Sequence, residues 1–172
     1  MKTIHLLIAS SLDGYIAGSN GEVDWLTPFE SVDYGYNAFI DTIDTILMGN
    51  NTYKEVLSFG EFPYKSKINY VFTRNAEPQD APYVQFITGN ATEFIKALKQ
   101  QNGLAIWLVG GGRLITTLLQ AELIDKITLF IIPVTIGRGI PLFPPSDHLS
   151  SWTLFDVKAL DKGMVQLDYI KK

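Results

Sequence analysis

Short apolar runs alternate with amphipathic segments along most of the chain. The runs are rich in β-branched and aromatic residues, and they have the length of buried strands. They cover residues 3–10, 45–48, 68–73, 84–87, 104–109 and 127–132. Because strands that alternate with helices usually pair in parallel, the pattern predicts a mostly parallel sheet with helices on its faces.

Three segments between these runs carry apolar residues at helical spacing. The residues are Tyr36, Phe39, Ile40 and Ile43 in the first segment, Phe94, Ile95 and Leu98 in the second, and Leu114, Ile115, Leu118 and Leu119 in the third. Asn90 and Glu93 form a capping box that predicts where the second helix begins. At the end of the chain, residues 152–159 and 164–170 flank a Leu-Asp-Lys-Gly sequence, which predicts an antiparallel hairpin.

Composition narrows the classes of protein to which the chain can belong. Its 172 residues suffice for one core and are too few for two typical domains, so we expect a single domain over residues 1–172. The net charge of −4, without a dense basic cluster, argues against a nucleic-acid partner. With no cysteine and two histidines, the chain lacks the residues of a thiolate or His-rich metal site, so we expect no metal.

The apolar run at the N-terminus is too short for a secretory signal or a membrane span. It covers residues 4–9, follows a single lysine and continues into a Ser-Ser-Leu-Asp-Gly sequence that offers no cleavage site. We therefore expect a first strand and a cytoplasmic protein without a membrane partner.

A glycine-rich junction is the most informative motif of the chain. The apolar run that ends at Val109 meets Gly110, Gly111 and Gly112, and a helical pattern starts directly afterwards. Glycine lets the backbone come close to a ligand, and the free amides of a helix N-terminus favour an anion such as a pyrophosphate. Arg113 lies in the first helical turn, where a cation opposes the helix dipole, so a bound anion would explain it best. The alternative is a tight turn between strand and helix with a surface arginine, because glycine-rich turns are common in α/β folds.

Two other junctions follow the same logic. One strand ends at Gly49 and is followed by Asn50, Asn51 and Thr52, small polar residues that suit either an ordinary helix cap or a second phosphate contact. The run 68–73 ends in Thr73 and is followed by Arg74, at the carboxyl end of a strand where α/β sheets usually bind ligands; a solvated loop arginine explains Arg74 equally well. Three such junctions in one short chain indicate an extended dinucleotide with several phosphates.

The order of these motifs resembles the dihydrofolate reductase superfamily. Within it, the chain resembles in particular stand-alone relatives of the C-terminal reductase domain of the bacterial riboflavin-biosynthesis deaminase-reductase. The motifs are Ser-Leu-Asp-Gly-Tyr-Ile-Ala at 11–17, Asp-Trp-Leu at 24–26, the segment 44–53, Thr-Arg at 73–74, the glycine turn at 109–113, and Pro-Val-Thr-Ile-Gly-Arg-Gly-Ile-Pro-Leu-Phe at 133–143. The resemblance implies an α/β, dihydrofolate reductase-like three-layer fold with a mostly parallel central sheet, flanking helices and a C-terminal antiparallel hairpin.

The resemblance also implies NADPH as the cofactor and assigns its contacts. The residues implied to contact NADPH are Ala9, Ile16, Gly49, Asn50, Thr52, Thr73, Arg74, Gly110, Gly111, Gly112, Arg113 and Leu114. Among them, Thr73 and Arg74 would approach the adenosine 2′-phosphate, which gives a physical reason to prefer NADPH to NADH. Relatives usually carry Gly-Arg-Lys-Thr where this chain has Asn50 and Asn51 before Thr52, so two cationic contacts are missing.

Hydride transfer to a C=N bond needs a protonated or polarised acceptor, and dihydrofolate reductases hold one carboxylate near the pterin for this purpose. The equivalent helix is expected to begin around residue 28, which makes Glu30 and Asp33 the two catalytic candidates; acids favoured by a helix N-terminus explain either one equally well. Asp13 and Trp25 are the candidates for substrate binding, although an aspartate that forms a turn before glycine explains Asp13 as well.

The motifs favour the riboflavin-type branch over dihydrofolate reductase proper. They imply an NADPH-dependent reductase that transfers hydride to a pyrimidine or pterin heterocycle, similar to 5-amino-6-(5-phosphoribosylamino)uracil reductase, and that forms a homodimer as riboflavin-type relatives do. A phosphorylated substrate would need further cations, for which Lys54, Lys65, Lys67 and Arg138 are the candidates. The alternatives are dihydrofolate reductase proper and a non-catalytic protein that has kept only the nucleotide-binding fold.

Overall fold

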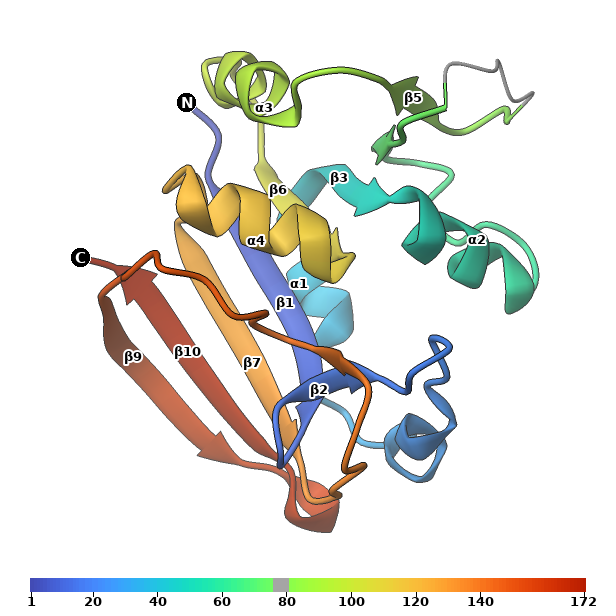
Figure 1. Cartoon of the computed structure of the whole chain (residues 1–172), viewed down its shortest axis with the longest axis vertical. Helices are drawn as coiled ribbons and strands as arrows, with labels where there is room; N and C mark the ends of the chain where they lie inside the picture. The colour runs from blue at the N-terminus through green and yellow to red at the C-terminus, as the bar shows by residue number, and fades with distance from the viewer. Residues whose placement is uncertain (76–80) are drawn as a thin grey trace.

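The computed structural model describes residues 1–75 and 81–172, and within them an eight-stranded sheet forms the centre of the molecule (Figure 1). Its strands are β1 (Ile4–Ser11), β3 (Ile43–Gly49), β4 (Ile68–Phe72), β5 (Gln85–Ile87), β6 (Ala105–Gly110), β7 (Lys126–Ile132), β9 (Trp152–Ala159) and β10 (Val165–Lys171). They lie in the order β5-β4-β3-β6-β1-β7-β10-β9. The pairs from β5 to β7 are parallel, and β10 and β9 add an antiparallel hairpin. The predicted sheet and C-terminal hairpin are both confirmed.

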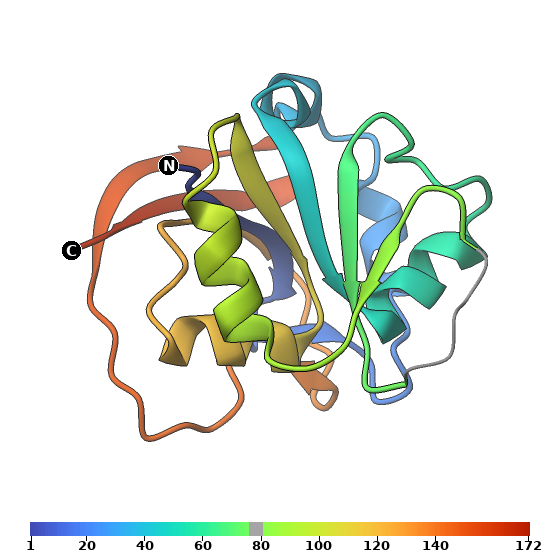
Figure 2. The same ribbon diagram turned by 90° about the horizontal axis from the view of Figure 1, so that it is seen from above.

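Helices cover both faces of the sheet and give the fold three layers (Figure 2). The helices are α1 (Tyr36–Asp41) and α2 (Asn50–Ser58) on one face, and α3 (Ala91–Lys99) and α4 (Gly112–Gln120) on the other. Alternate residues of β3 serve the two cores: Leu47 packs in the cluster under α3 and α4, whereas Ile46 and Met48 pack on the opposite side. Each of these side chains is 0% exposed, and burial of one such side chain stabilises the fold by about 1.5–3 kcal/mol.

Four elements are too short to show a hydrophobic period in the sequence. They are β2 (Tyr15–Ala17), β8 (Ile140–Pro141) and the 3-10 helices η1 (Asp24–Phe29) and η2 (Asp161–Gly163). β2 and β8 pair with each other as a separate antiparallel ribbon. This ribbon ties the loop after β1 to the proline-rich loop after β7.

Two helix predictions are wrong in their bounds. The expected helix around residue 28 is instead η1, which ends at Phe29, and α1 begins only at Tyr36. Gly35 has a φ of 78°, a left-handed conformation that keeps the two helices separate. The predicted apolar stripe of α1 also included Ile43, which is fully buried but begins β3.

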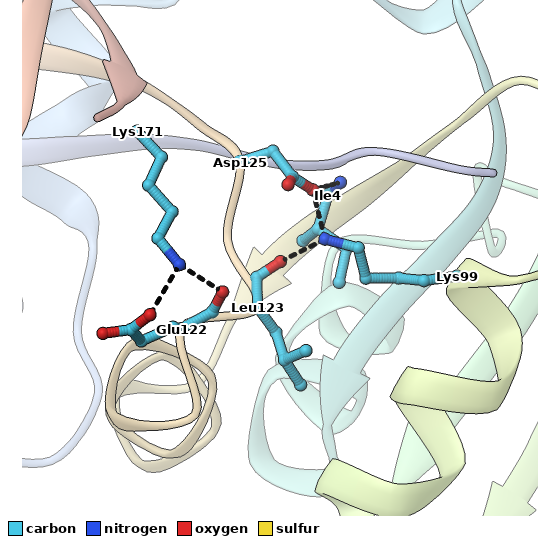
Figure 3. A network of polar contacts seen from close by, with 6 residues as sticks. All are labelled: Ile4, Lys99, Glu122, Leu123, Asp125 and Lys171. Carbon is cyan, nitrogen blue, oxygen red and sulfur yellow. Dashed lines mark hydrogen bonds and ion pairs between the residues drawn. The ribbon is translucent and has the colours of Figure 1, made fainter.

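A polar network fixes the start of β1 between its neighbours (Figure 3). The Asp125 carboxylate accepts a hydrogen bond from the backbone N–H of Ile4 at 2.7 Å and pairs with the ammonium of Lys99 at 2.6 Å. Lys99 also donates to the carbonyl oxygen of Leu123 at 2.9 Å. The network joins β1, α3 and the approach to β7, and so it sets the position of the strand that leads to the candidate site.

Among the helices that the structure describes, none combines the length and the apolar character needed to cross a bilayer.

Candidate functional site

A large cleft runs along the carboxyl ends of the parallel strands. Its volume is about 1720 Å³, and its walls include the ends of β1, β3, β4 and β6 and the first turns of α2 and α4. Sites for single small molecules usually measure about 300–1,000 Å³. The cleft therefore has room for a ligand larger than one small molecule, or for two ligands side by side.

One end of the cleft, here called the polar end, consists of residues 49–52, 73–74 and 110–113. Gly110 ends β6 with a φ of 141°, and Gly111 precedes α4 with a φ of 87°, so both hold conformations that favour glycine. A Cβ atom on Gly111 would lie 3.4 Å from Thr52 Oγ1 and 3.7 Å from Gly49 Cα. The glycine turn and the start of α2 therefore approach each other closely, and the backbone itself forms this wall.

The helix starts at the polar end have free backbone donors. α2 follows Gly49 and α4 follows Gly111, and neither helix has a side-chain cap. The first amides of a helix lack partners within the helix, so these two N-termini can bind anionic groups. A ligand with two linked phosphates suits this pair of helix starts.

The cations that line the cleft lie around this polar end. Lys54 lies on α2, Arg74 follows β4 and Arg113 lies in the first turn of α4; all three are exposed. No ion pair among the described residues involves any of them. Their charges are therefore available to a bound anion.

Asn50 adds a buried acceptor to the polar end. Its Oδ1 atom is buried and has no hydrogen-bond partner among the described residues. A buried polar atom without a partner costs about 1–3 kcal/mol of free energy. A ligand that donates a hydrogen bond to Asn50 would remove this cost, so the residue fits a binding role although it is uncharged.

The other end, here called the apolar end, is walled by a third hydrophobic cluster. Its residues in the cleft are Leu7, Ala9, Leu26, Phe29, Tyr34, Phe130, Ile132 and Met164. The ring of Tyr34 packs edge-on against that of Phe130, with centroids 5.0 Å apart. Burial, and to a lesser extent the neighbouring Tyr36, raise the pKa of Tyr34, so its phenol stays neutral and can donate a hydrogen bond.

The structure separates the two candidate catalytic carboxylates. Glu30 follows η1, is exposed and lines the cleft beside Phe29. Asp33 is also exposed, but it is not among the residues that line the cleft, and its carboxylate accepts a hydrogen bond from the backbone N–H of Gly35 at 2.9 Å. Asp33 thus stabilises the turn before α1, and Glu30 becomes the stronger candidate.

The two candidate substrate ligands lie outside the main cleft. The Asp13 carboxylate accepts hydrogen bonds from the hydroxyl of Ser11 at 2.6 Å and the backbone N–H of Gly137 at 2.7 Å. The bond from Ser11 is the largest of the effects that lower the pKa of Asp13. These contacts join the loop after β1 to the loop after β7. They favour the interpretation that Asp13 stabilises a turn. Trp25 lines a smaller hollow of about 300 Å³, together with Glu22 and other residues.

All twelve residues expected to contact a cofactor line the main cleft, from Ala9 and Ile16 to Leu114. Sequence reasoning did not single out Glu55, which also lines it. Burial, followed by the charges of Asp24 and Glu22, raises the pKa of this carboxyl group. No sequence motif identifies Glu55, because its acidic neighbours Glu22 and Asp24 are distant in the sequence and come near it only when the loop after β2 folds beside α2.

Lys162 is a second residue that the sequence does not point to. It lies in the turn of the C-terminal hairpin, and its ammonium donates to the backbone carbonyl of Pro28 and, at 2.8 Å, to the hydroxyl of Ser31. It thereby holds the segment that carries Glu30 against the hairpin. No group of three or more metal-ligating side chains comes together in the described part of the chain.

Solved structures share this architecture, and curated proteins have similar sequences. A putative riboflavin biosynthesis protein from Shewanella sp. PV-4 is 30% identical, with a TM-score of 0.88 over 99% of both chains. A dihydrofolate reductase from Enterococcus faecalis, complexed with NADP(H), has a TM-score of 0.72 over 99% of this chain and 96% of its own, at 20% identity, and so supports the fold alone.

The deaminase/5-amino-6-(5-phosphoribosylamino)uracil reductase of Thermotoga maritima has a TM-score of 0.73 at 15% identity; the match covers 99% of this chain and 57% of that one. The uncharacterized protein YwjB of Bacillus subtilis (strain 168) is 39% identical over 99% of this chain and 98% of its own. The family model for the RibD C-terminal domain matches residues 2–166. The chain therefore belongs to the RibD C-terminal domain family, a reductase-type family with a dihydrofolate reductase-like fold.

Proposed function

We propose that the protein is an NADPH-dependent reductase that transfers hydride to a pyrimidine- or pterin-type heterocycle. One observation carries the proposal: a single cleft joins an end built for anions to an apolar end with a carboxylate at its edge. A dinucleotide fits the first end and a flat heterocycle fits the second. Membership of a reductase-type family supports the same conclusion.

The cleft supports NADPH binding through four groups of residues, three at its polar end and one that includes Ala9 of its apolar end. Residues 110–113 would hold the pyrophosphate on the N-terminus of α4, and residues 49–52 would add contacts from the start of α2. Thr73 and Arg74 would approach the 2′-phosphate that distinguishes NADPH from NADH. Backbone groups of Ala9 and Ile16 would contact the carboxamide of the nicotinamide.

The residues of the apolar end would prepare the acceptor. Bound NADPH supplies the hydride for the reaction. The cleft-facing side chains of Phe29, Phe130 and Met164 would exclude water from the reacting atoms. The carboxylate of Glu30 would stabilise a protonated ring nitrogen, which makes the adjacent carbon a better hydride acceptor.

Titration of the protein with NADPH and NADH, followed by nicotinamide fluorescence, tests the cofactor. Oxidation of NADPH in the presence of dihydrofolate, dihydropterins or aminopyrimidinones then tests the reaction. We expect NADPH to bind more tightly than NADH. Failure of both nucleotides to bind would refute the proposal, whereas tight binding without turnover of any heterocycle would favour the non-catalytic alternative that Asn50 and Asn51 suggest.

The two carboxylates provide a matched pair of variants. We expect Glu30→Gln to lower kcat by about 100-fold or more, since a positioned acid or base contributes about 10²–10⁴-fold. Asp33→Asn changes the same kind of group in the same segment but outside the cleft, so its kcat should stay close to that of the wild type. Equal kcat values for the two variants would remove Glu30 from the mechanism.

The cytoplasmic location stays a prediction.

We also propose a homodimer formed through β9. β9 is the last strand of the sheet, and its Leu154, Phe155 and Val157 are 50%, 74% and 55% exposed. A second copy paired antiparallel around Val157 would set Asp156 of each copy opposite Lys158 of the other. Phe155→Asp should convert a dimer into a monomer in sedimentation velocity; a monomeric wild type would refute the dimer.

A further inference from the structure

The cleft distributes charge unequally between its two ends. Its lysine and arginine side chains are Lys54, Arg74 and Arg113, which come from α2, the loop after β4 and the start of α4. The cleft-lining residues of β1, η1, β7 and the hairpin turn include no lysine or arginine in the described part of the chain. The acidic side chains that line the cleft are Glu22, Glu30 and Glu55, and Glu30 lies next to Phe29 of the apolar end.

The other cations expected to serve a phosphorylated substrate are engaged elsewhere. Lys67 donates to the backbone carbonyls of Ile40 and Ile43, at 2.9 Å and 2.7 Å, and Lys65 pairs with Glu61 at 2.6 Å. Neither lines the cleft. Both ammonium groups therefore already have partners away from the site.

Arg138 and Lys162 do not line the main cleft either. Arg138 lines the smaller hollow together with Glu22 and Asp24. The ammonium of Lys162 donates to the backbone carbonyl of Pro28 and the hydroxyl of Ser31. Among the described residues, a phosphate at the apolar end would consequently meet the carboxylate of Glu30 and apolar walls, while the lysine and arginine residues of the cleft lie around its polar end.

We infer that the second substrate is a planar heterocycle that carries no phosphate group and is either neutral or protonated on the ring. This inference rests on the proposed function, and it narrows the substrate class of the same site. Ring N–H groups would donate to the carboxylate of Glu30, and a ring carbonyl would accept from the neutral phenol of Tyr34. The apolar walls would cover the faces of the ring. A dianionic phosphate would be repelled by Glu30 and desolvated without compensation.

A matched pair of ligands tests the inference on the intact protein. The pair is 5-amino-6-(5-phosphoribosylamino)uracil and the same compound without its phosphate, each titrated into the protein saturated with NADP⁺ and followed by tryptophan fluorescence. We expect the phosphate-free compound to bind at least about tenfold more tightly. Equal affinity, or tighter binding of the phosphorylated compound, would overturn the inference.

A second arm does not depend on the choice of heterocycle. Ribose 5-phosphate is titrated into the NADP⁺ complexes of the wild type, Glu30→Lys and the matched control Asp33→Lys. We expect Glu30→Lys alone to bind it at least about tenfold more tightly than the wild type, because only this substitution places a cation in the cleft. No gain, an equal gain in Asp33→Lys, or wild-type binding as tight as that of Glu30→Lys would overturn the inference.

The two proposals fail in different ways. If NADPH does not bind, the proposed reductase function is lost, whatever the phosphate compounds do. If NADPH binds and the phosphorylated uracil binds more tightly than its phosphate-free form, the reductase function survives and only the substrate class is wrong.

Discussion

His5 is a buried imidazole on β1, and it makes the stability of the fold depend on pH. Its Nε2 atom lies 2.8 Å from Thr128 Oγ1, and Thr128 in turn donates its proton to Asp168. Since the hydroxyl proton is used for Asp168, Thr128 accepts from an Nε2–H of His5. The ring also packs edge-on against Phe39, with centroids 5.0 Å apart. These contacts hold the imidazole ring in place between β7 and α1.

Burial, followed by the charge of Lys126, lowers the pKa of His5 from 6.5 to about 4, against the opposing effect of Asp168. Between these two values the unfolded chain binds a proton that the folded chain does not. The free energy of unfolding should therefore be highest above pH 6.5 and fall as the pH drops towards about 4. One pKa unit corresponds to about 1.4 kcal/mol, so the full loss is about 3 kcal/mol.

Urea unfolding of the wild type and of His5→Gln between about pH 7 and pH 4 measures this loss. Glutamine can keep a donor near Thr128 but cannot be protonated in this range. Between about pH 7 and pH 4, the free energy of unfolding of His5→Gln should therefore decrease by about 3 kcal/mol less than that of the wild type. Parallel curves for the wild type and His5→Gln would refute the reasoning, because they would show that His5 is protonated equally in the folded and unfolded states.

Three further substitutions test the cleft and the network that supports it. Arg74→Ala should weaken binding of NADPH by roughly 1.5–3 kcal/mol and leave NADH almost unchanged, as measured by nicotinamide fluorescence; equal losses would show that Arg74 does not contact the 2′-phosphate. Gly111→Ala should lower the free energy of unfolding by about 1–2 kcal/mol because of its left-handed φ, and should impair NADPH binding, whereas Gly112→Ala, at an ordinary φ, should be nearly as stable as the wild type. Normal NADPH affinity in Gly111→Ala would mean that the ligand does not approach this turn. Asp125→Ala should cost roughly 1–3 kcal/mol in urea unfolding, since it removes the acceptor of a β1 amide and of a lysine. As a control, Glu93→Ala removes an exposed ion pair with Lys96 and should lower the free energy of unfolding by less than about 1 kcal/mol. Similar losses in Asp125→Ala and Glu93→Ala would contradict the role given to the network.

The sequence predicts the sheet well because burial on both faces leaves a clear signal. The central strands are continuous apolar runs, and glycine marks where β3 and β6 end. The same glycines locate the polar end of the cleft, since a ligand that approaches backbone requires residues without side chains. These features are local in the chain, so a pattern of neighbours can show them.

The apolar end is harder to predict because distant segments form it. Phe29, Phe130 and Met164 meet only after the chain has folded, and no short motif links them. Glu30 and Asp33 look alike in sequence, and the turn at Gly35 separates their roles. The helix expected to begin around residue 28 differs for the same reason: the proline and acids there suggest a helix start, whereas the chain ends η1 at Phe29 and begins α1 only after the left-handed Gly35.

The place of β1 in the sheet has a consequence for synthesis of the protein. β1 is made first, yet its two neighbours are β6 and β7, so its hydrogen-bonding partners begin only at Ile106 and Lys126. A ribosome must therefore release most of the chain before this apolar strand is covered on either edge. High sequence separation of this kind slows folding and exposes strand edges that can aggregate. We expect nascent chains that stop before β6 to need a chaperone, and release of β7 to be the step at which the domain becomes resistant to protease.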